Sequence, residues 1–580
     1  MPDGIVSDRT LRFCASYAVA NSEILLSPLY STVVLRKRVL MRTFIVVFLS
    51  IATATAALGA DDRALEVNQL FAMFDKPGSP GCSVGVIRDG EFVYKRSFGY
   101  ASLELGVPLT PASVFYMASV SKQFTAASIV LAAEQGHLSL DDEVRKYLPE
   151  LPDYGRRITL RQMLHQTSGF RDFLDLVVIS GRNAEDLASP AEILKLIAHQ
   201  KGLNNVPGAE WVYSNSNYFL LGEVIRRATG KSLAHFAAEN IFQPLGMTHT
   251  LFYEDNTLVV PNRVAAYDPG QEGNFLVDWS TSYDIVGAGG LMSSVDDLLS
   301  WDRNFYANKL GTGTLPVELQ RHGVLNNGNQ IDYALGLSLG DYRGLPIVEH
   351  NGALFGYHSA FLRFPQERFS VIVLCNLATA GPEALARKIA DLYLAPDFKP
   401  TKSTVTAASD LPDPAPFAGT YLDPHTKTIY TFTADHSNLM AWGAVLRRIG
   451  ANRFYDLGSN VITFEKVNGT MRCSLAIPGE VYFSGDKLEP VHLSEAELAR
   501  FTGRYHSDEL DATYKLSTEK GRLTVKEGDK PPVIFDPATY DEFYSSDFRT
   551  LVFQPDADRR ISGFSVFTQA ARGIMFNRVN

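Results

Sequence analysis

An apolar pattern at helical spacing, from Phe124 to Leu131, directly follows Ser119-Val120-Ser121-Lys122 and ends at Gly136. This pattern predicts a buried helix with a glycine cap. Residues three apart lie on one helix face, so the Lys122 amine is expected to reach the Ser119 hydroxyl. A lysine that is partly removed from water can lose its proton and then accept one from serine. The segment therefore predicts an activated nucleophile, Ser119, with Lys122 as its base.

Two other copies of Ser-x-x-Lys show that the tetrapeptide alone is not specific. Ser484 to Lys487 contains turn residues and Ser517 to Lys520 is followed by a glycine, so both are predicted to be exposed loops between strands. The alternative interpretation of Ser119 is a simple helix N-cap. The companion motifs decide between the two interpretations.

Two further motifs follow Ser119 along the chain. Tyr213-Ser214-Asn215 lies in a polar loop before a helix pattern over residues 218–229, and loops held by such elements commonly carry catalytic groups. A second Tyr-x-Asn, at Tyr306 to Asn308, closes another helix pattern and is interpreted as a surface feature. His350-Asn351-Gly352 occurs once, after an apolar stretch, and is predicted at a strand edge. A lone histidine is by default structural or solvated, but the three motifs together indicate a serine acyl-transfer site.

With these motifs the chain resembles the serine β-lactamase and penicillin-recognising family, specifically its class C-like hydrolase branch, over about residues 65–394. Other stretches similar to this branch are Gly99 to Glu104, Leu164 to Gly169, Pro244 to Met247 and Gly289 to Ser294. The resemblance implies a β-lactamase/transpeptidase-like domain at residues 61–398, of α/β (α+β) class, with an antiparallel sheet and flanking helices. Hairpins are expected at Asp89-Gly90 and around residues 365–368.

The resemblance also implies roles for individual residues. Ser119 would form the acyl-enzyme, and Lys122 and Tyr213 would share general-base and general-acid duty. Asn215 would hydrogen-bond Lys122 and the substrate amide. The backbone N–H groups of Ser119 and Ala353 would form the oxyanion hole.

His350 and Gly352 belong to the motif expected to bind the substrate, and His350 is a departure from the family pattern. Many penicillin-recognising enzymes have Lys-Thr-Gly where this chain has His350-Asn351-Gly352. A lysine supplies a fixed charge for a substrate carboxylate, whereas a histidine supplies little charge or a pH-dependent one. His-x-Gly is similar to the pattern of aminopeptidase and esterase-like members, which favours a substrate other than a penicillin. The loop from Phe170 to Ser189 is expected to shape the pocket.

The C-terminal part of the chain contains a duplicated unit. After a linker-like stretch over residues 396–416, Phe417 to Tyr421 recurs as Phe501 to Tyr505, and spaced tyrosine, leucine and phenylalanine positions repeat behind each copy. Short alternating segments punctuated by turns predict two small antiparallel β-barrels, at residues 412–490 and 494–580. One long sandwich domain is the alternative. A hydrolase domain followed by two barrels resembles the architecture of bacterial D-aminopeptidases, in which a barrel loop helps to confine the substrate.

The N-terminal 60 residues have the pattern of an extension and a secretory signal. Basic residues from Arg36 to Arg42 precede an apolar stretch that ends in small residues near Ala60, and Met41 is an alternative start. This pattern predicts a secreted or periplasmic protein, without a stable membrane span once the signal is removed. An uncleaved N-terminal anchor is the alternative.

Composition limits the remaining functional classes. A net charge of −10 without a large basic cluster argues against a nucleic-acid partner, and no Cys/His spacing suits zinc, so we expect no metal or other cofactor. Buried free thiols are the default for Cys82, Cys375 and Cys473, although a Cys82–Cys375 bridge is left open. The expected partner is a small-molecule or short-peptide substrate, and a homo-oligomer is left open.

Two classes of function remain. The first is a serine hydrolase, D-aminopeptidase-like before esterase or amidase and before β-lactamase or DD-carboxypeptidase. The second is a non-catalytic penicillin-binding or peptide-sensing module.

Overall fold

The computed structural model describes residues 62–182, 189–278, 285–399, 413–435, 438–456, 460–477, 480–528, 530–556 and 560–579. The predicted signal segment and most of the predicted linker lie outside these residues. Residues Glu66–Asn580 form one compact unit by their contacts. Among the described residues, no helix combines the length and apolar character that crossing a bilayer requires.

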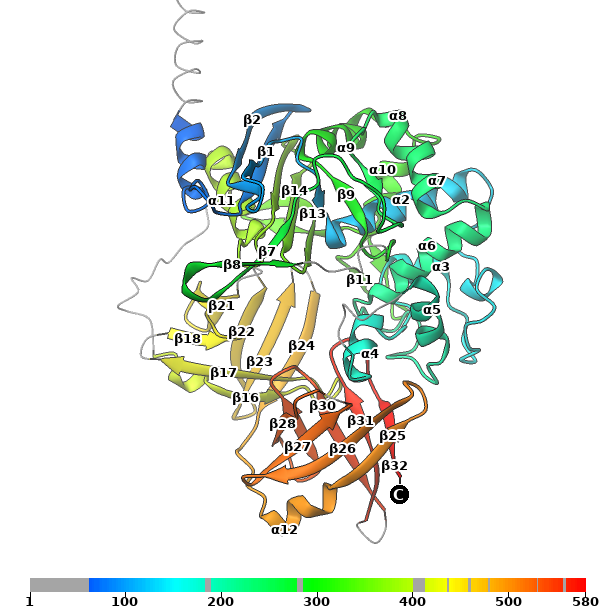
Figure 1. Ribbon diagram of the computed structural model, residues 1–580, viewed down its shortest axis with the longest axis vertical. Coiled ribbons are helices and arrows are strands. Elements are labelled where there is room, and N and C mark those ends of the chain that lie inside the picture. Colours follow the sequence, from blue (N-terminus) through cyan, green and yellow to red (C-terminus); the bar gives the residue numbers. More distant parts are fainter. Residues whose placement is uncertain are drawn as a thin grey trace, which may run out of the picture. The chain divides into compact units, whose positions relative to one another are not determined.

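A six-stranded antiparallel sheet forms the centre of the N-terminal part, in the order β12-β13-β14-β15-β1-β2 (Figure 1). Its strands are β1 (Cys82–Arg88), β2 (Glu91–Phe98), β12 (Ser338–Tyr342), β13 (Leu345–Leu354), β14 (Tyr357–Phe364) and β15 (Phe369–Cys375). Both expected hairpins are confirmed, since β1 pairs with β2 and β14 with β15. At the first turn Asp89 and Gly90 both have positive φ, 53° and 78°, as a two-residue hairpin turn of this hand requires.

Helices cover both faces of this sheet, which explains why every residue of β15 is buried. Val371 and Val373 pack into one buried cluster with Ile389 of α11 (Pro382–Leu394). Ile372 and Leu374 point the other way, into a larger cluster shared with α2 (Lys122–Glu134), α6 (Asn215–Thr229) and α9 (Val295–Ala307). The remaining helices of this part are α3 (Leu160–Leu164), α4 (Phe173–Ile179), α5 (Pro190–Ala198), α7 (Leu233–Ala237), α8 (Gln243–Leu245) and α10 (Leu315–Leu319).

Smaller sheets and single turns complete this region. Three strands pair in the order β5-β9-β6, and the pairs β3-β4, β7-β8 and β10-β11 are separate. Their bounds are β3 (Tyr100–Ser102), β4 (Val107–Pro108), β5 (Phe115–Tyr116), β6 (Leu251–Phe252), β7 (Ala266–Pro269), β8 (Phe275–Asp278), β9 (Leu291–Ser293), β10 (Gly323–Val324) and β11 (Gln330–Ile331). Short turns of helix are η1 (Ala118–Ser121), η2 (Val144–Lys146), η4 (Ala238–Phe242) and η5 (Gln271–Gly273).

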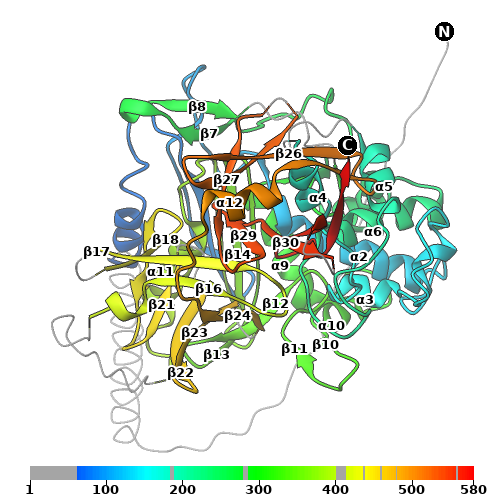
Figure 2. The same cartoon turned by 90° about the horizontal axis from the view of Figure 1, so that it is seen from below.

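The C-terminal part consists of two antiparallel sheets, seen from below in Figure 2. The first has nine strands in the order β19-β18-β17-β16-β24-β23-β22-β21-β20, and the second, β25 to β32, is a closed barrel. The first sheet comprises β16 (Gly419–Leu422), β17 (Ile429–Asp435), β18 (Asn438–Ala441), β19 (Ala444–Val445), β20 (Arg447–Arg448), β21 (Arg453–Tyr455), β22 (Val461–Val467), β23 (Thr470–Ile477) and β24 (Glu480–Lys487), preceded by η8 (Ala415–Phe417).

The closed barrel comprises β25 (Gly503–Ser507), β26 (Ala512–Glu519), β27 (Arg522–Glu527), β28 (Val533–Pro537), β29 (Glu542–Ser545), β30 (Thr550–Pro555), β31 (Ile561–Phe567) and β32 (Ile574–Val579). It follows α12 (Glu495–Leu498) and η9 (Ala499–Phe501). The predicted fold class, a catalytic α/β region followed by two barrel-like β units, is confirmed.

The predicted duplication has a direct structural counterpart. In both copies a turn of helix precedes the first strand, and the strand's tyrosine hydroxyl donates to the carbonyl four residues earlier: Tyr421 to Phe417 at 2.8 Å and Tyr505 to Phe501 at 3.0 Å. The two glycines that open these strands have matching φ values of 140° and 144°. Each copy therefore begins with the same local structure.

Two expectations from the sequence are wrong. Ser484 to Lys487 lies on strand β24 and not in a loop, so these two residues point to opposite faces. Ser517 lies on strand β26, whereas Lys520 lies in the turn that follows it, so the loop prediction is correct only for the lysine. Cys82 and Cys375 form a disulfide, because β1 and β15 are adjacent and place these residues directly opposite each other. Cys473 is a buried free thiol, as expected.

Candidate functional site

Ser119 lies on η1, the turn of helix that runs into α2. Its predecessor Ala118 has a positive φ of 46°, a conformation that non-glycine residues rarely adopt and that is often retained at functional sites. Ser121 holds the turn, since its hydroxyl donates to the Ala118 carbonyl at 2.5 Å and accepts from the Leu291 N–H at 3.1 Å. No side chain caps η1 or α2, so the Ser119 hydroxyl is not used as an N-cap.

Lys122 is fully buried one turn below Ser119. Its Nζ lies 3.0 Å from Ser119 Oγ, 2.8 Å from Asn215 Oδ1 and 2.8 Å from the Ala288 carbonyl oxygen. Burial lowers the pKa of Lys122 to about 7, against the opposing attraction of the Asp172 carboxylate. A neutral amine has two N–H donors, which Asn215 and Ala288 satisfy, and its lone pair then faces the Ser119 hydroxyl. This geometry lets Lys122 accept the serine proton.

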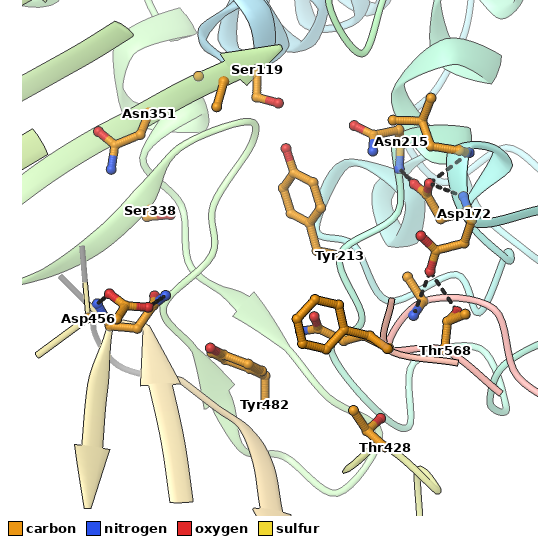
Figure 3. A pocket seen from close by; sticks show the side chains of 18 of the residues that line it. Ser119, Asp172, Tyr213, Asn215, Ser338, Asn351, Thr428, Asp456, Tyr482 and Thr568 are labelled. Carbon is orange, nitrogen blue, oxygen red and sulfur yellow. Dashed lines mark hydrogen bonds between the residues drawn. The ribbon is translucent and has the colours of Figure 1, made fainter. Parts of the chain in front are cut away.

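Tyr213 lies on the other side of the serine, on the loop before α6. Figure 3 shows its hydroxyl pointing toward Ser119, and the Lys122 Nζ lies 4.8 Å from the centre of its ring. Burial raises the pKa of Tyr213 well above its ordinary value, while its interaction with the Ser119 side chain opposes this rise. The residue is therefore a phenol at neutral pH and can donate a proton, whereas a neutral Lys122 can accept one.

His350 lies on β13, where this strand extends past its neighbour. The β12–β13 pairing stops at Ser338 opposite Glu349, so residues 350–354 pair only with β14 and leave an edge facing η1. The strand-edge expectation is therefore confirmed.

Gly352 is required on that edge because the two segments touch. A Cβ at this position would lie 2.3 Å from the Met117 carbonyl oxygen and 3.0 Å from the Ser119 nitrogen. Ala353, the next residue, lines the cavity together with Ser119. The backbone of β13 thus passes beside Ser119.

The His350 ring is held neutral and in one tautomer. Its Nδ1 lies 2.7 Å from the Asn351 carbonyl oxygen, which can only accept, so Nδ1 carries the proton. Its Nε2 lies 3.2 Å from the Tyr333 hydroxyl, which then donates to it. Burial, together with the charge of Lys122, lowers the pKa of His350 to about 3. The ring therefore supplies no positive charge at neutral pH.

Asp172 is a buried carboxylate of this site that the motifs did not reveal. It caps α4, and its oxygens accept from the N–H groups of Leu174 at 2.9 Å, Asp175 at 3.3 Å and Asn215. Asn215 in turn contacts Lys122, so a continuous path of hydrogen bonds runs from Ser119 to Asp172. Figure 3 shows Asn215 and Asp172 together on one side of Tyr213. Burial raises the pKa of Asp172, although these N–H donors oppose the rise.

Asp175 links this side of the site to the C-terminal barrel. Its Oδ2 accepts from the Thr568 hydroxyl at 2.6 Å and from the Ala570 N–H at 3.2 Å. Burial and the neighbouring Asp172 carboxylate raise the pKa of Asp175 to about 7. Of the expected pocket segment Phe170 to Ser189, the residues Asp172, Leu174, Asp175 and Val178 line the cavity, at the cap and on helix α4 rather than in a loop. Residues 183–188 of that segment lie outside the described residues.

A buried ion pair fixes the same segment to the barrel. Arg171 Nη1 lies 2.6 Å from Glu509 Oε2, and only 5% of each side chain is exposed. Arg171 also donates to the carbonyl oxygens of Arg572 at 3.0 Å and Gly573 at 3.1 Å. The barrel therefore positions the loop that carries Asp172.

A cavity of about 800 Å³ opens over these groups. Ser119, Tyr213, Asn215, His350, Gly352 and Ala353 all line it, and both C-terminal sheets contribute walls that sequence reasoning did not nominate, through Thr428, Trp442, Asp456, Tyr482, Phe548 and Gln569. In Figure 3, Asn351, Ser338 and Asp456 lie across Tyr213 from Asp172 and Thr568. Among the described residues, no group of three or more histidine, cysteine or acidic side chains is arranged to hold a metal ion.

The walls of this cavity contain more acidic than basic groups. They include six carboxyl groups, Asp172, Asp175, Glu349, Glu383, Asp456 and Asp547, and two guanidinium groups, Arg387 and Arg549. Burial raises the pKa of Asp172, and raises those of Asp175 and Glu383 to about 7, so a cationic neighbour would favour their ionised forms. Both guanidinium groups are bound to acids, since Arg387 lies 2.6 Å from Glu349 and Arg549 lies 2.6 Å from Asp547. A cationic ligand group suits such a cavity better than an anionic one.

The chain is similar to several known proteins. A family model described as Beta-lactamase matches residues 67–395. A D-aminopeptidase of Brucella anthropi is 27% identical over 522 residues, which cover 86% of this chain and 95% of that protein. A D-aminopeptidase of Gluconobacter oxydans (strain 621H) is 30% identical over 362 residues, or 62% of this chain and 66% of that protein.

The fold also matches solved structures. An octameric penicillin-binding protein homologue from Pyrococcus abyssi superposes with a TM-score of 0.52 at 21% identity, covering 81% of this chain and 98% of that one.

Proposed function

This chain belongs to the beta-lactamase family of serine hydrolases, and on that premise we propose that it cleaves amides or short peptides whose acyl residue has a free amino group, as a D-aminopeptidase does. The relatives that match most of its length are D-aminopeptidases, which supports the D configuration of that residue. The catalytic roles below are part of the same proposal.

The reaction would begin at Ser119. Its oxygen attacks the amide carbon while its proton passes to neutral Lys122, and the N–H groups of Ser119 and Ala353 receive the negative charge on the former carbonyl oxygen. The C–N bond then breaks as Tyr213 gives its proton to the leaving amine, and the proton on Lys122 restores Tyr213. Water repeats these transfers on the ester, releasing the acid and Ser119.

The observation that carries the choice of substrate is Asp172, a buried carboxylate that contacts the Asn215 backbone beside the catalytic lysine. Burial raises the pKa of Asp172, so an ammonium group on the acyl residue would favour its ionised form and pair with it, whereas a substrate carboxylate would be disfavoured beside it. The neutral ring of His350 supports the same choice, because no fixed cation stands where Lys-Thr-Gly would provide one. Penicillins, which carry a carboxylate, are therefore poor candidates.

A substrate panel tests the proposal. D-alanine amide should be hydrolysed faster than L-alanine amide and faster than a chromogenic cephalosporin. N-acetyl-D-alanine amide, which lacks the ammonium group, should lose at least about a hundredfold in kcat/KM, since an unpaired buried charge costs several kcal/mol. Equal rates with and without the acetyl group, or a cephalosporin as the best substrate, would contradict the proposal.

A pair of variants locates the ammonium site. Asp172→Asn should lower kcat/KM for D-alanine amide but leave hydrolysis of a simple nitrophenyl ester largely intact. Asp456→Asn, on the other side of Tyr213, is the matched control and should affect both substrates equally or neither. An equal loss on amide and ester with Asp172→Asn would mean that the carboxylate only supports the fold of the site.

We also propose that the protein acts outside the cytoplasm, secreted or periplasmic. The basic and apolar pattern before Ala60 supports export. The Cys82–Cys375 disulfide adds support, since such bonds persist in oxidising compartments. Cell fractionation with an antibody against the chain tests this location, and recovery in the cytoplasmic fraction would contradict it.

A further inference from the structure

A second, smaller cavity opens beside the nucleophile. It has a volume of about 90 Å³ and shares Ser119, Leu174, Asn215 and Ala353 with the large cavity. Ser119, Asn215 and Ala353 surround the position that the reacting carbonyl would occupy. A group bound in the small cavity must therefore be attached within a bond or two of the carbonyl carbon.

The walls of the small cavity are mostly apolar and include no acidic or basic side chain, whereas the walls of the large one include several. Phe173 and Leu174 of α4 contribute on one side, and Ile285, Leu354 and Phe355 contribute elsewhere. Phe173 and Ile285 are buried, so their positions are fixed by packing. Such a cavity favours a hydrocarbon group over an ammonium, a carboxylate or the water-exposed chain of a leaving group.

Phe355 is held in an unusual conformation at this wall. It lies in the two-residue turn between β13 and β14 with a φ of 52°, a region that asparagine and glycine normally fill in such turns. The next residue, Gly356, packs closely against β7, where a Cβ would lie 2.5 Å from the Tyr267 nitrogen. A bulky residue keeps such a backbone only where its surroundings hold it, and this is often at functional sites.

We propose that the small cavity binds the side chain of the acyl residue, and that it selects aliphatic side chains up to about the size of leucine. Its volume equals roughly three water volumes, which accommodates three or four carbon atoms but not an aromatic ring. The scissile bond then faces the large cavity, where the leaving group can depart and water can enter. This inference rests on the proposed acyl-enzyme at Ser119 but not on the ammonium site.

Two opposite changes of volume test the cavity. Ile285→Phe should fill it, and Phe355→Gly should enlarge it while relieving the unusual φ. Val259→Phe is the matched control, because Val259 is 84% exposed and lies outside both cavities. The probes are the amides of glycine, D-alanine, D-leucine and D-phenylalanine, and the 4-nitrophenyl esters of acetate, butyrate and hexanoate.

In the wild type, kcat/KM should rise from glycine to D-leucine amide and fall at D-phenylalanine amide. Ile285→Phe should lower the ratio of D-leucine to glycine amide at least about tenfold, because even one methylene in an apolar pocket is worth that much. Phe355→Gly should raise the ratio of D-phenylalanine to D-leucine amide by a similar factor. Glycine amide and the acetate ester, which lack a side chain, report whether each variant is folded and active.

The outcomes separate this inference from the proposed function. If no amide is hydrolysed but the ester series shows the same chain-length preference and Ile285→Phe abolishes it, the cavity assignment stands and the aminopeptidase proposal fails. If amides are hydrolysed and neither variant changes the side-chain ratios, the cavity assignment is overturned. A wild-type preference for D-phenylalanine amide would also overturn it.

Discussion

The charge state of Lys122 can be tested through protein stability, because the fold holds its pKa near 7 while the value in an unfolded chain is close to 10.5. Between these two pH values the unfolded state binds one proton more than the folded state. The free energy of unfolding must then rise with pH by about 1.4 kcal/mol per unit. Lys122→Met removes this term and keeps the length of the side chain.

The difference between the two proteins isolates the lysine from all other titrating groups. Between pH 7.5 and 9.5 the wild type should gain about 2.5 kcal/mol of unfolding free energy relative to Lys122→Met. Well below pH 7 the lysine is protonated in both states, so the difference should become constant. Urea unfolding of both proteins at half-unit pH intervals measures this curve.

A flat difference across the whole range would refute the reasoning, since it would mean that Lys122 stays charged in the folded protein. Activity gives an independent check. If the neutral amine is the base, kcat/KM of the wild type should fall tenfold per pH unit below about pH 7. A profile without a break near that pH would point to another base.

Three further predictions concern the structure around the site. Gly352→Ala should lower kcat at least about a hundredfold, because a Cβ would lie 2.3 Å from the Met117 carbonyl oxygen and would displace β13 from Ser119. A variant with normal steady-state rates would contradict this close approach. Glu509→Gln should cost about 3–5 kcal/mol of stability, because it leaves the buried Arg171 without its partner. Asp508→Asn, in an exposed ion pair, should cost less than about 1 kcal/mol. Equal melting temperatures for both variants would argue against a buried link to the barrel. Reduction of the Cys82–Cys375 bridge should lower the free energy of unfolding by roughly 2–5 kcal/mol, because the bridge closes a sequence separation of 293 residues. An unchanged melting temperature in reductant would show that the bridge does not contribute to stability.

Local features were the most predictable from sequence. The Asp89-Gly90 turn and the glycine that ends α2, Gly136 with a φ of 79°, depend on a few neighbouring residues, and the structure has both. The duplicated start of the two C-terminal sheets was visible because the same residues recur at one spacing. The three motif segments converge on one cavity, which no local rule could guarantee.

Features that depend on distant contacts were not predictable in the same way. Asp172 has the sequence context of an ordinary helix cap, and only the fold places it beside Asn215. Thr568 contacts Asp175 across 393 positions of sequence. The Cys82–Cys375 bridge required knowing that β1 and β15 are neighbours, since two predicted strands do not reveal their pairing. The sequence predicted a loop at Ser484 because the following residue, Gly485, suggested a turn, but this segment is a continuous strand.

The most direct test of the account is to locate the acyl group during turnover. The enzyme would be mixed with the 4-nitrophenyl ester of butyrate, quenched in acid within milliseconds, digested and mapped by mass spectrometry. We predict a butyryl group on Ser119 of the wild type and none in Ser119→Ala. The group should accumulate in a Tyr213→Phe variant if the substitution slows deacylation more than acylation. Hydrolysis that proceeds in the wild type with the label on another residue, or that persists at the wild-type rate in Ser119→Ala, would contradict the account.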